Sequence, residues 1–522
     1  MTSKGAVASG HAETSRAAAV VLAEGGNAFD AALAAMCAAC VAEPVLASLG
    51  GGGFLLARPG RGRHQGRTIA YDFVPQTPRS RARAGEVDFF PVHADFGPTR
   101  QEFHIGMGSI ATPGIVRGLF EIHRDLGSMP MRDIVAPAVE LGRTGVRVDR
   151  MQAYMMGVVG AILLSTPASR ALFESRDHPG RPLGEGEMLL QRDLAETLEV
   201  LAIEGADLFY RGEIASRIVD DCRGGGGWLT AEDLKGYRVE RRTPLAVDVL
   251  SARLQLNPPP STGGILIAFA LELLRDLDPA VLPFGSAAYL GRLAQVMRLT
   301  NRARLERRLH ELTTETVADT LLDPTLIAAY RARVLGHPPA PRGTTHISVI
   351  DAAGNAASLS LSNGEGSGHV IANTGIVLNN VLGEEDINPH GFHRWPEDVR
   401  IGSMMAPTLV LDRDGSITAL GSGGSNRIRT AVLQVLLDRL VFAMPLIEAV
   451  AAPRIHVEDD KLSIEPGYRD SEVEAFARPL AVVDRWPELN MFFGGVHAVR
   501  RGAEGGFEGA GDPRRGGTVG SA

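Results

Sequence analysis

Apolar and polar residues alternate along residues 345–351, Thr-His-Ile-Ser-Val-Ile-Asp, and this pattern predicts a half-buried β-strand. Residues 352–354 predict a tight turn, and residues 356–362 predict the returning strand. If Asp351 pairs with Asn355, the same register sets Thr344 opposite Ser362, whereas a one-residue shift sets Asn363 there. Directly opposed residues lie about 4.5–5.5 Å apart. A hydroxyl or an amide is therefore expected beside Thr344. The alternative interpretation is an ordinary amphipathic hairpin whose polar residues face solvent.

Two further patterns involve glycine. The Ala-rich residues 14–42 predict two helices that are interrupted at Gly25-Gly26-Asn27. A glycine run at residues 50–53 then leads into a strand at 54–57. These glycines are compatible with a phosphate cradle, but no Gly-Lys-Ser/Thr follows and they enter a strand rather than a helix. Close approach of two backbones is the favoured interpretation.

The rest of the chain predicts a long helical part, a connector and a final part with strands and a helix. Residues 115–335 predict mostly helix, and the Pro/Gly/Arg-rich residues 337–343 predict an exposed connector. Residues 408–411 and 416–420 predict a strand pair. A glycine-rich turn at 421–426 and a helix at 428–443 follow, so backbone N–H groups converge at one point. That point could hold an oxyanion, although a simple tight turn is the alternative.

Thr344 is a candidate nucleophile. A threonine hydroxyl attacks poorly unless a base takes its proton, and a free α-amine on the same residue has a pKa near 7.7–8.0 in general. An internal threonine has no free amine. Activity would therefore require cleavage between Gly343 and Thr344, at the end of the exposed connector.

Composition excludes several classes of function. The chain has 522 residues, of which 44% are hydrophobic and 22% charged, as in a soluble globular protein of two to four domains or one large α/β unit. A net charge of −8 gives no indication of nucleic acid or an anionic membrane as a partner. Cys37, Cys40 and Cys222 are too few for a disulfide framework or a four-cysteine zinc site. The apolar run at 31–42 is too short to span a bilayer, and residues 1–20 contain no apolar stretch typical of a secretory signal, so we expect a cytoplasmic protein.

Many motifs in one order resemble the γ-glutamyltransferase (glutathione hydrolase) family of N-terminal-nucleophile hydrolases. The resemblance extends over nearly the whole chain and rests on residues 24–32, 49–54, 112–114, 193–198, 209–212, 258–264, 343–351, 378–380, 423–425 and 511–515. It implies an α/β fold, a four-layer αββα sandwich built from two autocleaved subunits, residues 1–343 and residues 344–522. It also implies no cofactor and no metal.

The resemblance assigns roles to individual residues. Gly343 and Thr344 would form the autocleavage site, and Thr344 would then attack a substrate amide to give an acyl-enzyme. Thr345 and Ser362 would orient the nucleophile, while Gly423 and Gly424 would stabilise the oxyanion. Water, an amine or an amino acid would accept the acyl group.

The substrate pocket departs from the family pattern. Asn363, Glu384, Ser403 and Met404 occupy substrate-binding positions, but Met404 replaces a serine and Glu384 replaces an aspartate. Val74 stands where the family has the arginine that holds the substrate α-carboxylate, and Val381 replaces a glutamine. An isopropyl group cannot form that ion pair. We therefore expect a different or broader acyl specificity, for example glutaryl-like or less polar groups, unless an arginine from another direction substitutes (Arg79, Arg400 or Arg427).

Three alternatives accompany this interpretation. Residues 384–386 with His390 and His393 could form a metal cluster, but lining of the pocket is favoured. A related acylase acting on non-glutamyl amides is the first alternative to glutathione hydrolysis or γ-glutamyl transfer. A non-catalytic binding or scaffold homologue is the second, and the intact set of candidate catalytic residues argues against it.

Overall fold

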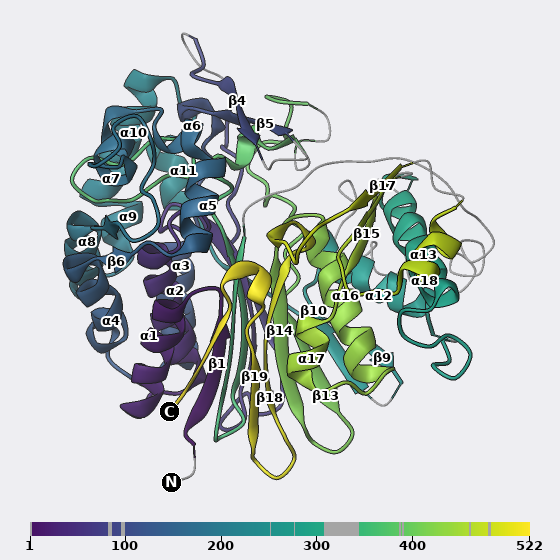
Figure 1. Ribbon diagram of the computed structural model, residues 1–522. Coiled ribbons are helices and arrows are strands. Elements are labelled where there is room, and N and C mark those ends of the chain that lie inside the picture. Colours follow the sequence, from purple (N-terminus) through teal and green to yellow (C-terminus); the bar gives the residue numbers. More distant parts are fainter. Residues whose placement is uncertain are drawn as a thin grey trace.

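The computed structural model describes residues 3–81, 86–95, 100–250, 252–275, 277–306, 344–385, 388, 391–458, 461–478 and 482–522. Two β-sheets lie side by side in the centre, and helices cover the outer face of each (Figure 1). This is the four-layer αββα arrangement that the resemblance implied. None of the helices in the described part of the chain has the length and apolar character needed to cross a bilayer.

The first sheet has seven strands, and every neighbouring pair is antiparallel. Its strands, in spatial order, are β20 (Thr518–Ser521), β1 (Gly5–Ser9), β11 (Thr345–Asp351), β12 (Ala356–Ser362), β2 (Gly52–Arg58), β3 (Ile69–Asp72) and β8 (Glu240–Arg242). The predicted hairpin is thus β11 and β12, at the centre of the sheet. Thr345 pairs with Leu361 and Asp351 N–H bonds to the carbonyl of Asn355, which confirms the register that sets Thr344 opposite Ser362.

The second sheet has six strands. In spatial order they are β19 (Phe507–Ala510), β18 (Gly495–Arg501), β14 (Ile417–Gly423), β13 (Thr408–Asp412), β10 (Ala252–Leu256) and β9 (Leu245–Val249). Smaller sheets consist of β15 (Ile455–Glu458), β16 (Lys461–Ile464) and β17 (Val482–Arg485), of β4 (Phe90–Asp95) and β5 (Arg100–Ile105), and of β6 (Val146–Arg147) and β7 (Met188–Leu189). The predicted strand pair at 408–420 is confirmed as β13 and β14.

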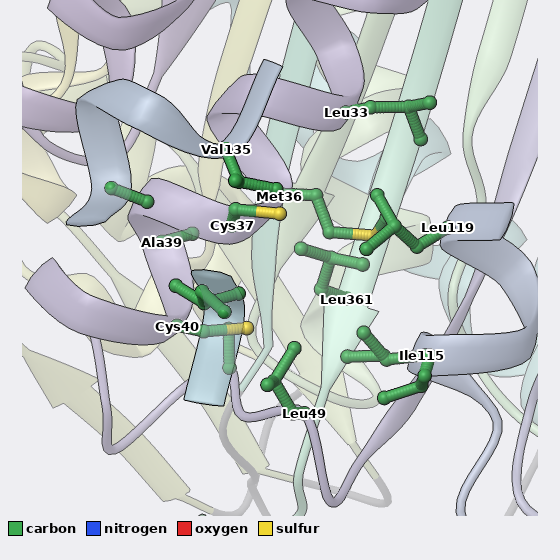
Figure 2. Packing of buried hydrophobic residues seen from close by; sticks show 14 of the residues in the cluster. Leu33, Met36, Cys37, Ala39, Cys40, Leu49, Ile115, Leu119, Val135 and Leu361 are labelled. Carbon is green, nitrogen blue, oxygen red and sulfur yellow. The ribbon is translucent and has the colours of Figure 1, made fainter. Parts of the chain in front are cut away.

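The helices on the first sheet pack around α2. These helices are α1 (Ala12–Ala23), α2 (Ala28–Ala42), α3 (Ile115–Leu126), α4 (Met131–Thr144) and α8 (Arg192–Glu204), with α5 (Arg150–Val158), α6 (Gly160–Leu163), α7 (Pro167–Phe173), α9 (Asp207–Tyr210), α10 (Glu213–Gly225) and α11 (Ala231–Gly236) beyond them. A capping box between Asn27 and Asp30 starts α2, and every residue of α2 is buried. Its small side chains let neighbouring elements approach closely. Cys37 and Cys40 lie among apolar side chains, as predicted for small core residues (Figure 2).

The outer face of the second sheet is covered by α12 (Thr262–Leu273), α16 (Arg427–Leu440) and α17 (Leu446–Ala451), and α13 (Ala287–Glu306) and α18 (Asp470–Ala477) lie beyond them. Four short 3₁₀ helices complete the described elements: η1 (Met107–Ser109), η3 (Val381–Gly383), η5 (Met491–Phe493) and η6 (Pro513–Arg515). The predicted helix at 428–443 is confirmed as α16.

The two faces of β11 differ in a way that positions the site. Ile347 and Val349 belong to the core under α2, whereas Ile350 belongs to the core between the sheets. Because side chains alternate along a strand, Thr345 faces α2 and Thr344 faces the second sheet. Between the sheets, aliphatic side chains such as Ile350 and Leu409 are accompanied by serine hydroxyls, which form hydrogen bonds from one sheet to the other.

Ser348 and Ser358 make those cross-sheet hydrogen bonds. Ser348 Oγ donates to the carbonyl of His497 at 3.1 Å, and Ser358 Oγ donates to the carbonyl of Leu420 at 2.9 Å. His346, wholly buried, bonds to Ser360 at 2.8 Å. Burial lowers the pKa of His346 well below its usual value, so this imidazole is neutral. These hydrogen bonds therefore connect the two sheets in the neighbourhood of Thr344.

Some predictions need correction. The described part of residues 115–335 is mostly helical, as predicted, but β6 to β10 also lie within it, and β8, β9 and β10 extend the two main sheets. The sequence analysis also missed β1, whose residues Gly-Ala-Val-Ala-Ser have weak strand propensity, and the strands of the glycine-rich C-terminal tail. The connector at 337–343 lies outside the described residues.

Candidate active site

Thr344 lies directly before β11 and is 5% exposed. Its carbonyl accepts a hydrogen bond of 3.1 Å from Nη1 of Arg515. Its backbone also packs against Gly423, where a Cβ would lie only 1.8 Å from the Thr344 carbonyl oxygen. Arg515 and Gly423 therefore fix the main chain of the candidate nucleophile from two directions.

Gly423 and Gly424 form the junction between β14 and α16. Gly424 has a φ of +118°, a backbone conformation that residues with a Cβ rarely adopt. Among the described residues no acceptor is found for the Gly424 amide. Gly424 precedes Asn426, the N-cap of α16, by two residues, and so lies near the helix end where N–H groups concentrate positive potential. Gly423 thus lies next to Thr344, and the oxyanion-binding role of this turn stays a prediction.

Thr345 faces away from Thr344, toward the end of α2. Its Oγ1 donates to Oε2 of Glu43 at 2.7 Å, and Thr14 Oγ1 donates to the other carboxylate oxygen at 2.7 Å. Glu43 is the C-cap residue of α2 and is only 6% exposed. This buried carboxylate, which the sequence analysis did not single out, holds the first residue of β11.

Arg515 is the second residue whose role sequence reasoning missed, although it lies in the 511–515 motif. Burial lowers the pKa of Arg515 to about 10, against the opposing effects of Asp512 and Glu43, so the guanidinium stays charged at neutral pH. Arg515 bonds to the Thr344 carbonyl and lines the same pocket as Glu43. The spacing of residues 43 and 515 along the chain gives no signal of this proximity.

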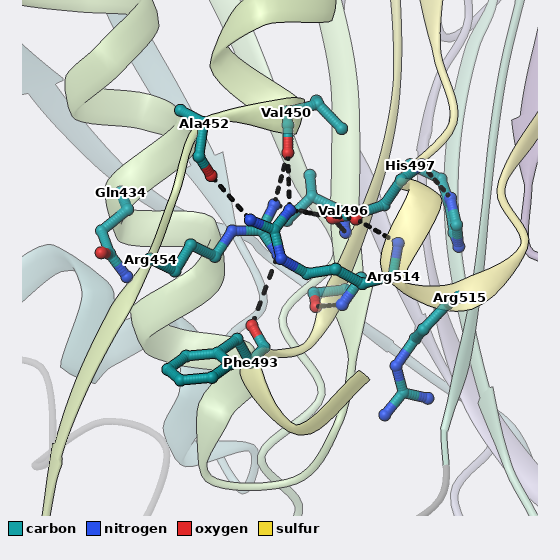
Figure 3. Close-up of polar contacts among 12 residues, drawn as sticks. Gln434, Val450, Ala452, Arg454, Phe493, Val496, His497, Arg514 and Arg515 are labelled. Carbon is teal, nitrogen blue, oxygen red and sulfur yellow. Dashed lines mark hydrogen bonds and ion pairs between the residues drawn. The ribbon is translucent and has the colours of Figure 1, made fainter. Parts of the chain in front are cut away.

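A buried ionic network holds the segment that carries Arg515. Asp512 accepts from Nη2 of Arg454 at 2.7 Å and from Nη1 of Arg514 at 3.2 Å, and Arg514 also pairs with Glu465 at 2.6 Å. Arg515 points away from Arg454 and Arg514 (Figure 3). Burial raises the pKa of Asp512, but Arg454 and Arg514 outweigh it, so the pKa lies below its usual value. The network is therefore ionised and anchors η6.

Ser362 and Asn363 lie on the β12 side of Thr344. Ser362 ends β12, and its Oγ accepts from the amide of Gly364 at 3.2 Å. Asn363 is completely buried, and neither atom of its side-chain amide has a partner among the described residues. The carboxylate of Glu384 lies close by, since its Oε1 would be 2.6 Å from a Cβ on Gly364. The structure thus brings together these three sequence-predicted residues.

Apolar side chains fill the neighbourhood of Val74. Val74 is 2% exposed and shares one cluster with Val381, the other apolar replacement, and the further members are Phe54, Ala111, Leu382, Trp395, Ile401 and Met405. Phe54 pairs with Ser360 on β12, so this apolar cluster adjoins the Ser362 side of Thr344. The indole Nε1 of Trp395 is buried there without a partner in the described part of the chain.

The three arginines considered as substitutes make other contacts. Arg400 donates to the carbonyl of Val74 at 2.6 Å, stacks on Tyr237 at 4.7 Å and lies 3.6 Å from Asp72, with a side chain only 5% exposed. Arg79 pairs with Asp398 at 3.4 Å at the surface. Arg427 donates to the carbonyl of Phe492 at 2.9 Å. Of the three, Arg400 has a hydrogen bond to a residue of the apolar cluster, and that bond goes to the main chain of Val74.

Ser403 and Met404 lie beside the start of α12. Ser403 Oγ accepts from the amide of Met405 at 3.0 Å, and its carbonyl accepts from the amide of Thr262 at 2.8 Å. The sulfur of Met404 accepts from Oγ1 of Thr262 at 3.2 Å. Met404 packs against the core under the second sheet rather than in the cluster of Val74 and Val381. The structure therefore does not bring these three replacements together.

A pocket opens beside Thr344 on the side of β1. Its cavity volume is about 30 Å³, and the space rises to about 510 Å³ only when the open solvent at its mouth is included. Polar lining comes from Gly10, His11, Glu43, Asp149, Gln152, Thr344, Thr345, Gly423, His497 and Arg515, and apolar lining comes from Pro44, Val45, Leu46, Met151, Met155 and Met156. A substrate atom in this pocket would therefore be next to the candidate nucleophile.

The remaining predicted features are only partly visible. Gly343, Asp386 and His390 lie outside the described residues. His393 packs against the ring of Phe89 at 4.4 Å, and within the described residues no group of three or more His, Cys, Asp or Glu is placed to hold a metal ion. The glycine run before β2 serves close backbone approach, as favoured, since a Cβ on Gly53 would lie 2.4 Å from the carbonyl of Ser360.

Comparisons with known proteins agree with this geometry. A family model described as gamma-glutamyltranspeptidase matches residues 14–522. The chain is 31% identical over 542 residues to a glutathione hydrolase proenzyme of Escherichia coli (strain K12), covering 98% of this chain and 90% of that protein. It is 30% identical over 535 residues to an acylase ACY 1 proenzyme of Pseudomonas sp. (strain V22), covering 99% and 93%.

Among solved structures, cephalosporin acylase from Bacillus halodurans superposes with a TM-score of 0.85 at 22% identity, covering 99% of this chain and 96% of that one. At this identity the likeness establishes the fold. The fold, the position of Thr344 at the start of a central strand and the match over nearly the full length give one conclusion. The chain belongs to the gamma-glutamyltranspeptidase family.

Proposed function

We propose that this protein is an autoprocessed acyltransferase and amidohydrolase that forms an acyl-enzyme on Thr344. The observation that carries the proposal is the position of Thr344, buried between Arg515 and the Gly423-Gly424 turn and opposite Ser362. The names of two relatives, glutathione hydrolase proenzyme and acylase proenzyme, support both the chemistry and the maturation by cleavage.

Maturation would begin with attack of Thr344 Oγ on the carbonyl carbon of Gly343. The peptide C–N bond breaks as the ester bond forms, and the threonine nitrogen takes the hydroxyl proton. Water then hydrolyses the ester, which leaves a carboxylate on residue 343 and a free α-amine on Thr344. The products would be a large subunit of residues 1–343 and a small subunit of residues 344–522, held together because β11 and β12 lie between β1 and β2.

In turnover, the α-amine of Thr344 accepts the proton of its own hydroxyl, and Oγ attacks the substrate amide. The amides of Gly423 and Gly424 would stabilise the tetrahedral oxyanion, a contribution of about 2.7–4 kcal/mol per donor in general. The proton passes to the departing amine as the C–N bond breaks. Water or an amine then attacks the ester and releases Thr344. Ser362 and Thr345 are the residues that would orient the nucleophile.

The acyl group would lie on the β12 side, next to Asn363, Glu384 and the apolar cluster of Val74. A substrate α-carboxylate placed among those apolar side chains would be costly without a cation. Arg400, the nearest of the three arginines to Val74, is held by the Val74 carbonyl and Tyr237. Asn363 and the indole of Trp395 offer neutral hydrogen bonds instead. We therefore propose that the pocket favours acyl groups that lack this carboxylate and are less polar than γ-glutamyl, as in the acylase alternative, while γ-glutamyl transfer or glutathione hydrolysis stays the family-level function.

Intact mass spectrometry followed by a donor panel tests this proposal. Purified protein should give two masses that correspond to residues 1–343 and 344–522. The matured enzyme should release p-nitroaniline faster from pentanoyl-p-nitroanilide than from the glutaryl or the γ-glutamyl compound, both of which carry the carboxylate. A high turnover of the γ-glutamyl compound would overturn the acyl specificity, and a single mass of 55.5 kDa without turnover would favour a non-catalytic scaffold. A cytoplasmic location stays a prediction.

A further inference from the structure

Part of the pocket beside Thr344 is lined by apolar side chains, and we call this part the methionine pocket. It consists of Pro44, Val45, Leu46, Met151, Met155 and Met156. Val45, Leu46, Met155 and Met156 are almost completely buried, whereas Met151 is partly exposed at the pocket. The polar residues Glu43 and Thr345 bond to each other within the lining, so the free surface offered to a ligand there is mainly hydrocarbon and thioether.

The start of α5 is fixed, so Met151 is held in place. Asp149 caps α5 by accepting from the amide of Gln152 at 2.7 Å, and the Asp149 amide donates back to Oε1 of Gln152 at 2.8 Å. The side-chain Nε2 of Gln152 also donates to the carbonyl of Ala42, the last residue of α2. The two walls of the methionine pocket, residues 44–46 and α5, are therefore joined by a buried side chain. The cavity itself is only about 30 Å³, so a hydrocarbon group enters it when the flexible methionine side chains move apart.

The pocket lies on one defined side of Thr344. In the first sheet β11 has β1 on one side and β12 on the other. Gly10, directly after β1, lines the pocket, whereas Ser362 and Asn363 are at the end of β12. An amide substrate whose carbonyl carbon is at Thr344 Oγ extends in two opposite directions. If the acyl group lies toward β12, the nitrogen substituent lies toward β1.

We propose that the methionine pocket binds the apolar part of the amine, both the amine that leaves the donor and the amine that accepts the acyl group. This inference rests on the proposed function, because it requires an acyl-enzyme on Thr344. The ligand class is a primary amine with an unbranched or aromatic hydrocarbon substituent. Methionine side chains are flexible and polarizable, so they suit hydrocarbon groups of varied shape.

The reaction that this pocket promotes is aminolysis of the acyl-enzyme. The amine nitrogen attacks the ester carbonyl, the bond to Thr344 Oγ breaks, and the proton of the amine passes through the Thr344 α-amine to Oγ. His11 and Asp149 lie 3.7 Å apart at the pocket, and the Asp149 side chain is 47% exposed. A polar end of a longer amine can therefore remain in water while its hydrocarbon part contacts the methionines.

A partition experiment tests the inference on the mature enzyme. One acyl p-nitroanilide serves as the donor, and methylamine, propylamine, butylamine and hexylamine serve as acceptors. The ratio of aminolysis to hydrolysis is measured from the common acyl-enzyme, so it does not depend on how fast that intermediate forms. We expect the ratio to rise about two- to fourfold per methylene group, the range for partial to full burial of a CH₂. A ratio that is independent of chain length in the wild type would overturn the inference.

Three variants locate the effect. Met151→Trp should fill the pocket and abolish the dependence on chain length, whereas Met151→Leu, similar in volume, should retain it. Met188→Trp is the matched control, because Met188 is 41% exposed on β7 and does not line the pocket. A dependence on chain length that survives in Met151→Trp would contradict the inference. Absence of p-nitroaniline release from every donor would instead contradict the proposed function itself.

Discussion

The guanidinium of Arg515 donates to the carbonyl oxygen of Thr344 at 3.1 Å, although the two residues are far apart in the chain. This contact joins the start of a central strand to the C-terminal segment after β19. Since Nη2 of Arg515 also bonds to the carbonyl of Met491 at 3.5 Å, the planar guanidinium holds two backbone segments at once. The nucleophile is therefore positioned by the end of the chain.

Arg515→Lys should lower kcat by about 10- to 100-fold, because an ammonium group cannot bond to both carbonyls in one geometry. KM should change less, since the contact is to the nucleophile's own backbone. Steady-state kinetics on matured enzyme measure both. Arg469→Lys is the control, with a side chain that is 75% exposed. An unchanged kcat in Arg515→Lys would show that the contact does not position Thr344.

Thr344→Ala should neither mature nor turn over substrate, because the variant has no hydroxyl to attack residue 343 or a donor amide. Intact mass spectrometry should give one species near the full mass of 55.5 kDa. Thr344→Ser keeps the hydroxyl and should still mature. Cleavage in Thr344→Ala would show that a different bond is cut.

Gly423→Ala should reduce kcat at least about 100-fold and lower stability by about 1–3 kcal/mol. The added methyl group would lie 1.8 Å from the Thr344 carbonyl oxygen, so β14 and β11 would have to separate. Turnover and thermal unfolding report the two effects. Gly291→Ala is the matched control, because nothing lies within 4 Å of a Cβ there, and it should be neutral or stabilising.

Glu43→Gln and Thr345→Val should each lower kcat/KM by about tenfold, since either change removes a charge-assisted hydrogen bond, generally worth about 1.5–3 kcal/mol. Because they remove the same 2.7 Å contact, the double variant should be little worse than the more severe single variant. Thr14→Val, which loses the other hydrogen bond to Glu43, should have a smaller effect. Strictly additive losses would mean that the two side chains act independently.

Asp438→Asn tests a buried carboxyl under the second sheet. Burial raises the pKa of Asp438 to about 8, against the effect of Arg454, so the folded protein keeps this proton while the unfolded chain loses it above its ordinary pKa of 3.8. The folded state then holds one proton more, and its stability falls as pH rises from about 4 to 8, by at most about 1.4 kcal/mol per pH unit.

The stability of Asp438→Asn does not fall in this way as pH rises, because asparagine has no carboxyl group to titrate. The melting temperature of Asp438→Asn minus that of the parent should therefore be more positive at pH 8 than at pH 5, measured in a Thr344→Ala background to keep one chain. Asp470→Asn, with a side chain that is 83% exposed, should show no such trend. A difference that does not change with pH would mean that Asp438 is already ionised in the folded protein at pH 5.

Local pattern predicted several parts of this fold well. The hairpin of β11 and β12 could be predicted from alternation and a glycine turn, and its two possible registers were narrowed to the one with Thr344 opposite Ser362 only by the structure, since both faces of β11 are buried. The break at Gly25-Gly26-Asn27 between α1 and α2 followed from glycine and an N-cap residue. By contrast, β1 is Ala- and Gly-containing and has no strand signal of its own. It is a strand because Gly5 to Ser9 pair with β11 and β20.

The sequence by itself determined which residue is the candidate nucleophile and which residues lie beside it on the hairpin, because both depend on positions close in the chain. Only the tertiary structure decided that Glu43 and Arg515 hold Thr345 and Thr344, and that a methionine-lined pocket opens on the side of β1. Those contacts join the end of α2, the start of α5 and the C-terminal segment. Contacts between such distant segments arise from the packing of layers, which no local periodicity encodes.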